Sequence, residues 1–276
     1  MFRLYGGLLI ENEYYNYTEL EPLQAGMLAF ADRDSNNIHS RLLSLIKSSI
    51  KFVYKDADGK DKRELNTKDY LNIFTIDAYK ITYEIMKRIK KTDKLIFKEN
   101  FYCNRCGVFV EKNECWDTLV ETGEIDEIFA DNYDDLYSTT ELVDPIEVEN
   151  AGSFLTLKRL PVTLGDMLSM PVLKSERDKF NYIWDRQIKE ITGMDIKTFN
   201  RTVARSHNDS FCAKHIKTHD NYIAMTESMK LFGWDDQYRV LQCDECGNTD
   251  FGDNRLDFSN FLQALSVNKK SPFSNM

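Results

Sequence analysis

Apolar residues recur at helical spacing along most of this chain. Leu42, Leu45, Ile46 and Ile50 follow one another at intervals of three and four residues, which places them on one face of a helix. The same periodicity predicts five more helices, with the following apolar residues: Leu23, Met27 and Phe30; Ile81, Ile85 and Ile89; Phe180, Ile183, Trp184, Ile188 and Ile191; Tyr222, Met225, Met229 and Phe232; and Phe258, Phe261, Leu262 and Leu265. Residues typical of helix ends flank several of these stripes: Pro22, Asp77, Ser175 with Asp178, and Asp220 at the starts, and Gly193 and Gly233 at the ends.

Strand signals are few and short. Phe52–Tyr54 is typical of a strand that leads into a turn at 56–60. Other short strands are expected near the N-terminus and near the cysteines. The sequence therefore predicts an α+β fold that is predominantly helical. With 276 residues, 42% of them hydrophobic, the chain can bury one large core or two smaller ones.

Four of the six cysteines form two Cys-x-x-Cys-Gly motifs, at 103–107 and 243–247. Each motif makes a turn that aims two thiolates at one point, and its glycine permits the positive φ that such a turn needs. Together the two motifs supply the four ligands of one tetrahedral zinc ion: Cys103, Cys106, Cys243 and Cys246. The alternatives are two separate sites completed by other residues, and reduced structural thiols or a redox pair. A shared ion would join segments 140 positions apart.

The same offset of 140 positions relates other features of the two halves. The residues that align without a gap are Leu20 with Leu160, Met27 with Met167, and Leu28 with Leu168. This layout is typical of a diverged tandem duplication, although two unrelated helical segments would also fit it. We expect two similar helical modules joined by a zinc site of four cysteines, with an N-terminal module at 1–110, an acidic connector at 111–152 and a C-terminal module at 153–276.

Acidic residues are concentrated in one segment of the chain. Residues 111–150 contain fourteen Asp and Glu against Lys112 alone, a balance of −13, whereas the net charge of the whole chain is −9. The segment is either a solvated connector or an arm that docks on a basic neighbour through interleaved apolar residues such as Trp116, Ile125 and Phe129. An acidic balance also counts against nucleic-acid binding, which requires neutralised phosphates.

Membrane and secretion signals are lacking in this sequence. No apolar run approaches the roughly 18 residues of a membrane span. The first five residues have neither the charged nor the apolar region of a signal peptide. Cysteines at metal-binding spacing also fit a reducing compartment. We therefore expect the chain to fold in the cytoplasm.

No motif of a known catalytic site stands out. The chain has no glycine-rich phosphate loop, no Gly-x-Ser-x-Gly and no His-Glu-x-x-His. The strongest alternative is the group of His207, Cys212, His215 and His219, in which Cys212 could be a thiol nucleophile or the imidazoles could hold a second metal ion. Ordinary surface histidines fit this polar segment better, because no acidic residue stands where a metalloprotease helix requires one. We expect a protein that is not an enzyme.

Several features of the first 110 residues resemble one known protein family. They are Leu-Tyr-Gly-Gly at 4–7, Leu-x-Pro-Leu at 20–23, a predicted helix at 39–52, the segment at 65–71, and the closing Cys-x-x-Cys-Gly at 103–107. Together they are similar to the baseplate hub and tail-assembly family of contractile-tailed, T-even-like bacteriophages. Where this family usually has one module, this chain has two, and the acidic segment has no counterpart.

The resemblance implies a structural protein of a phage tail baseplate. Such a protein is made in the host cytoplasm, stays in the virion, and contacts other tail proteins or further copies of itself. One alternative is a transient tail-assembly chaperone that is absent from the mature particle. Another, of a different class, is a zinc-containing regulator that binds nucleic acid.

Overall fold

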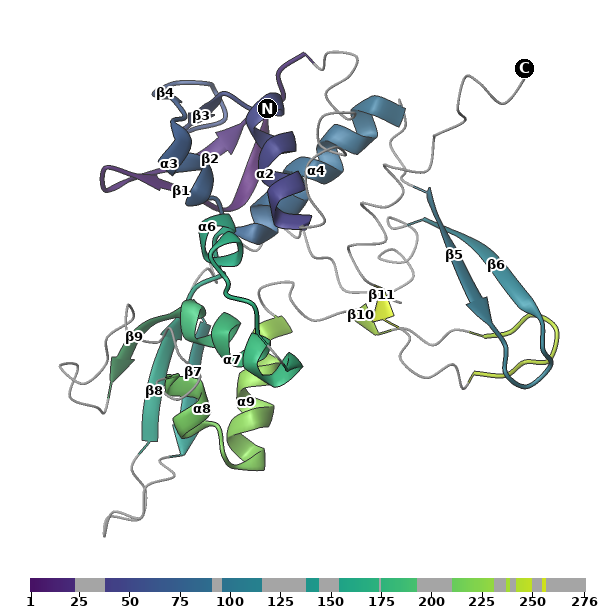
Figure 1. Ribbon diagram of the computed structural model, residues 1–276. Helices are drawn as coiled ribbons and strands as arrows, with labels where there is room; N and C mark the ends of the chain where they lie inside the picture. Colours follow the sequence, from purple (N-terminus) through teal and green to yellow (C-terminus); the bar gives the residue numbers. More distant parts are fainter. Residues whose placement is uncertain are drawn as a thin grey trace, which may run out of the picture.

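The computed structural model describes residues 1–22, 38–90, 96–115, 138–143, 154–173, 175–192, 210–230, 237–238, 242–249 and 255–256. In these parts of the chain, helices alternate with antiparallel strands (Figure 1). None of the helices they contain combines the length and the apolarity needed to cross a membrane.

A four-stranded antiparallel sheet opens the N-terminal half. Its strands, in the order in which they pair, are β1 (Phe2–Ile10), β2 (Glu13–Thr18), β3 (Phe52–Tyr54) and β4 (Lys62–Glu64). Glu11 and Asn12 join β1 to β2 with positive φ at both positions, the geometry of a tight hairpin turn. The predicted turn at 56–60 joins β3 to β4, and within it Asp56 accepts two backbone hydrogen bonds. The predicted strand at Phe52–Tyr54 is therefore confirmed.

Helices pack with this sheet around one hydrophobic core. They are α2 (Ile38–Ser49), α3 (Thr67–Leu71) and α4 (Thr75–Lys90). The stripe predicted for the first of them is confirmed, because Leu42, Leu45, Ile46 and Ile50 are each at most 2% exposed. These residues share one core cluster with apolar residues of β1, α3 and α4.

The C-terminal half has a three-stranded antiparallel sheet, in the order β7 (Ser138–Val143), β8 (Phe154–Arg159) and β9 (Ile188–Thr192). Its helices are α6 (Leu164–Leu168), α7 (Glu176–Gln187), α8 (Phe211–His215) and α9 (His219–Lys230). Ser175 accepts a hydrogen bond from the backbone N of Asp178 at 3.1 Å, so this predicted cap is confirmed. A smaller core cluster gathers around Trp184 and Met225.

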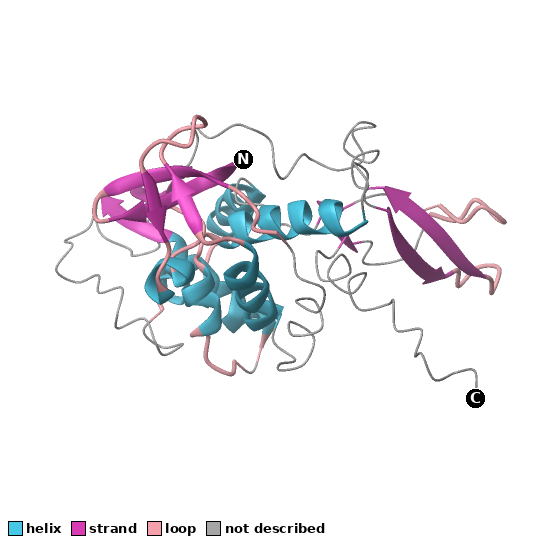
Figure 2. Ribbon diagram, turned by 90° about the horizontal axis from the view of Figure 1, so that it is seen from above, coloured by secondary structure: helices cyan, strands magenta, loops and turns pink. Residues whose placement is uncertain are grey.

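Two further hairpins complete the described structure. β5 (Ile96–Tyr102) pairs along its whole length with β6 (Phe109–Cys115), and β10 (Gln237–Tyr238) pairs with β11 (Arg255–Leu256). Figures 1 and 2 both show the β5–β6 hairpin at one end of the molecule, away from the main group of helices.

The prediction of a predominantly helical fold with two helical modules is wrong. Four antiparallel sheets occur within the described residues, and the largest has four strands. Part of the error lies at Ile188 and Ile191, which stand at helical spacing after Trp184. The helix there ends at Gln187, and both isoleucines belong to β9. Gly193 therefore does not end this helix.

One order of elements nevertheless recurs in the two halves. The hairpin β1–β2 is followed by α2, β3, α3, α4 and β5, and the hairpin β7–β8 is followed by α7, β9, α8, α9 and β10. The sheets repeat as well, because β2 lies between β1 and β3 just as β8 lies between β7 and β9. β4 in the first half and α6 in the second half interrupt this order. The positions 140 residues after β4 and 140 residues before α6 lie outside the described residues. The offset of 140 positions thus relates two modules that each contain both strands and helices.

The two halves interlock at α6. The backbone N of Thr75 donates to the carbonyl of Val162, and the backbone N of Leu164 donates to the carbonyl of Ile73, both at 2.9 Å. Leu164 is fully buried and belongs to the core cluster of the N-terminal half. A short helix of the second half therefore completes the core of the first.

The ends of the acidic segment are strands. Its first residues belong to β6, and β7 lies near its other end. The apolar residues predicted to dock this segment, from Trp116 to Tyr137, lie outside the described residues. So do the helices predicted after Pro22 and around Phe258.

Candidate metal centre

Two knuckles of the same local geometry carry the four predicted ligands. In the first, the backbone N of Gly107 donates to the carbonyl of Cys103 at 2.8 Å, and the backbone N of Cys103 donates to the carbonyl of Val108 at 2.9 Å. In the second knuckle, the backbone N of Gly247 donates to the carbonyl of Cys243 at 2.8 Å, and the backbone N of Cys243 donates to the carbonyl of Asn248 at 2.9 Å.

A glycine closes each knuckle because the chain must turn there with positive φ. This angle is 74° at Gly107 and 66° at Gly247. A residue with a Cβ would be strained in that conformation. The glycines identified in the sequence thus have the role predicted for them.

The fold brings the two knuckles together. The Sγ atoms of Cys103 and Cys246 lie 3.6 Å apart, and those of Cys106 and Cys243 lie 3.7 Å apart. All four sulfur atoms lie within 4.8 Å of one another. In a regular tetrahedron with metal–sulfur bonds of about 2.3 Å, the sulfur atoms are about 3.8 Å apart. These four cysteines can therefore hold one metal ion.

Polar groups around the sulfur atoms favour the thiolate form of Cys103. Burial raises the pKa of this thiol, but hydrogen bonds from the backbone N–H groups of Cys106 and Arg105, and from the other thiols, lower it to about 6. The side-chain amide of Asn248 lies 3.7 Å from the same sulfur. Asn248 was not among the residues predicted from the sequence, although an amide after a Cys-x-x-Cys-Gly motif could have been considered. Such donors offset negative charge that gathers on thiolate ligands.

The centre is closed on one side and open on the other. Cys103 and Cys243 are buried and pack with Val110 of β6. Cys106 is exposed, and Cys246 is partly exposed. An ion can therefore reach the site from solvent, while its inner half is held by apolar packing.

In the second group of candidate residues, the described structure places the Cys212 thiol in the core. Cys212 is fully buried in α8, and its backbone N donates to Asp185 at 2.9 Å. Burial and the nearby Asp185 carboxylate raise the pKa of the Cys212 thiol. Since solvent does not reach this thiol, the described structure gives it a place in the core. His219 lies exposed at the start of α9, the side chain of His215 is not described, and His207 lies outside the described residues.

Comparisons with protein families, with curated proteins and with solved structures found no match to this chain.

Proposed function

We propose that this chain is a structural protein in which one zinc ion fastens the β5–β6 hairpin to residues 242–249. The observation that supports this role is the closed ligand set. Four cysteine thiolates occupy every position of a tetrahedral ion, whereas catalytic zinc sites keep one position for water or substrate. Tetrahedral sulfur sites in proteins hold zinc or iron. We propose zinc because a role in fastening two segments needs no redox change.

Metal analysis of the purified chain tests this proposal. We expect about one zinc per chain by mass spectrometry of the elements. Cys103→Ser and Cys243→Ser should each lose it, because a three-thiolate set binds zinc far more weakly. Cys115→Ser is the matched control, because Cys115 pairs with Ile96 at the end of the hairpin opposite the knuckle. Iron in place of zinc, or full zinc retention in both ligand variants, would contradict the proposal.

We also propose that the zinc-bound hairpin is a contact surface for other proteins. Phe109 is 72% exposed and Tyr102 is 52% exposed, and their ring centroids lie 6.0 Å apart. Both residues stand at the knuckle end of the hairpin, where a metal ion would hold them in place. Exposed aromatic side chains on a rigid support are typical anchors of protein interfaces.

Photocrosslinking tests the contact surface. A benzophenone amino acid at position 109 should crosslink to a partner protein in the native assembly. The same amino acid at position 9 is the matched control, because Leu9 is an apolar residue that is 46% exposed on β1, far from the hairpin. Equal crosslinking at the two positions would mean that the hairpin has no special part in binding.

The resemblance of the first 110 residues supports a place in the tail baseplate of a contractile-tailed phage. In that setting the chain would contact neighbouring tail proteins and have no enzymatic role. Protein mass spectrometry of purified virions tests this location, and we expect the chain at a constant number of copies per particle. Its absence from virions, together with its presence in infected cells, would contradict a virion role and would instead fit a transient assembly chaperone.

A further inference from the structure

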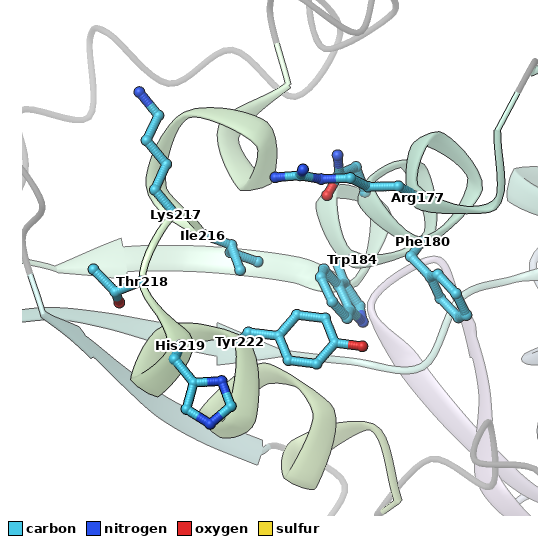
Figure 3. A pocket seen from close by; sticks show the side chains of 9 residues that line it. Arg177, Phe180, Trp184, Ile216, Lys217, Thr218, His219 and Tyr222 are labelled. Carbon is cyan, nitrogen blue, oxygen red and sulfur yellow. The ribbon is translucent and has the colours of Figure 1, made fainter.

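A cavity lies between α7 and α9, and none of the four cysteines of the metal centre lines it. Its volume is about 470 Å³, within the range of pockets that bind small molecules. Figure 3 shows aromatic and basic side chains from both helices around it. The residues that matter for its chemistry are Arg177, Phe180, Asn181, Trp184, His219 and Tyr222.

Three aromatic rings form one side of this cavity. The ring centroids of Phe180 and Trp184 lie 6.0 Å apart in a stacked arrangement, and those of Trp184 and Tyr222 lie 6.0 Å apart edge to face. Trp184 is buried, but Phe180 is 39% exposed and Tyr222 is 51% exposed. Large aromatic faces therefore remain open to a ligand. All three rings were assigned to helix cores from the sequence, since their spacing alone does not distinguish a filled core from a cavity wall.

The charges around the cavity have one sign. Two cationic side chains, Arg177 and Lys217, line the cavity. Among the described residues, no Asp or Glu lines the cavity, although the chain as a whole carries a net charge of −9. A local excess of positive groups in an acidic protein favours an anionic ligand.

A buried amide adds a second, independent observation. Asn181 lines the cavity and is only 4% exposed, and its Nδ2 has no hydrogen-bond partner among the described residues. Buried polar groups are nearly always paired in native proteins, so an unpaired donor in a cavity wall calls for an acceptor from outside the chain. A carboxylate or phosphate oxygen would supply one.

We propose that the cavity between α7 and α9 binds a small aromatic anion, meaning a planar ring system that carries a carboxylate or a phosphate. The ring stacks on the exposed rings of Phe180 and Tyr222, and the anionic group accepts hydrogen bonds from Asn181 and pairs with Arg177. Both contacts are of kinds that contribute strongly in partly desolvated sites.

Calorimetric titration of the full, zinc-loaded chain tests this site with three probes. These are 2-naphthoate, 1-naphthyl phosphate and the neutral 2-naphthylmethanol. We expect at least one of the two anions to bind about tenfold more tightly than the neutral alcohol. Arg177→Ala should weaken binding of that anion about tenfold, and Tyr222→Ala should weaken all binding several-fold.

Controls separate loss of the site from loss of the fold. Arg177 and Tyr222 are exposed, so their replacement should leave the circular dichroism spectrum unchanged. Lys60→Ala removes a cation from an exposed turn of the N-terminal half and should leave the affinity unchanged. The proposal is overturned if neither anion binds at millimolar concentration, or if the affinity is the same in Arg177→Ala and Tyr222→Ala as in the unchanged chain.

Discussion

Two buried ionisable residues give the N-terminal half opposite responses to pH. Asp77 is fully buried in the first turn of α4, where it accepts backbone hydrogen bonds from Tyr5 and Gly6 of β1. Burial raises the pKa of its carboxyl from 3.8 to about 7. Burial also lowers the pKa of His39 in α2 from 6.5 to about 4. The sequence suggested Asp77 as a helix cap, but its bonds show that it ties a strand to the helix.

These shifts predict the pH dependence of stability. Between pH 3.8 and about 7, the folded chain holds a proton on Asp77 that the unfolded chain releases, so the free energy of unfolding falls as pH rises. Between pH 6.5 and about 4, the unfolded chain takes up a proton that buried His39 refuses, so the free energy of unfolding falls as pH drops. Between about pH 4 and 6.5, Asp77 and His39 therefore change the free energy of unfolding in opposite directions.

Single substitutions should reveal each slope. The measured quantity is the free energy of unfolding of a variant minus that of the unchanged chain. Between about pH 4.5 and 6, this difference should rise with pH for Asp77→Asn and fall with pH for His39→Gln. Each slope should reach up to about 1.4 kcal/mol per pH unit. Urea unfolding at several pH values measures this, and the common contribution of the metal centre cancels in the differences. Parallel curves for the three proteins would contradict the assigned shifts.

At the scale of elements, local signals were predicted well and pairing was not. The stripe from Leu42 to Ile50 and the cap at Ser175 depend on residues within a few positions, so periodicity and capping rules find them. Strands were expected near the N-terminus and near the cysteines, where β1 and β5 lie, but their lengths and their partners were not predicted. β9 was taken for helix because two isoleucines happen to stand at helical spacing. Which strands pair is decided by contacts that are distant in sequence.

The contact between α3 and α6 predicts an unusual effect of adding one methyl group. A Cβ on Gly165 of α6 would lie 3.0 Å from the carbonyl oxygen of Leu71 and 3.3 Å from its Cβ. Helix propensity alone predicts that Gly165→Ala stabilises the chain by about 1 kcal/mol. We expect a loss of about 1 to 2 kcal/mol instead, because α6 must move away from the core that Leu164 completes. Thermal unfolding decides the sign, and a raised midpoint would show that the helices are not tightly packed.

At the scale of the whole molecule, the four cysteines of the candidate metal centre could be predicted and their surroundings could not. Each Cys-x-x-Cys-Gly motif specifies its own knuckle, and the four sulfur atoms meet as expected. The packing of Val110 on this centre and the cavity at Trp184 depend on how helices and strands approach one another. No spacing in the sequence encodes those distances.

The separation of the cores predicts what removal of the proposed zinc ion would do. Within the described residues, the cluster around Cys103, Cys243 and Val110 shares no residue with the core of the N-terminal half. Removing the ion leaves thiolates that repel one another and abolishes the metal-based link between the knuckles, so the hairpin at 96–115 and the segment 242–249 should open. The core of α2 and α4 should stay folded, because its apolar contacts do not involve the ion.

Hydrogen exchange followed by mass spectrometry measures this difference directly. After chelation, peptides from 96–115 and 242–249 should lose most of their protection, whereas a peptide from α2 should keep it, and added zinc should restore the first two. If α2 lost protection to the same extent, metal binding would be coupled to folding of the whole chain, as in a zinc finger. The ion would then be required for the fold itself, and the hairpin could not act as a separate contact element that the metal centre holds in place.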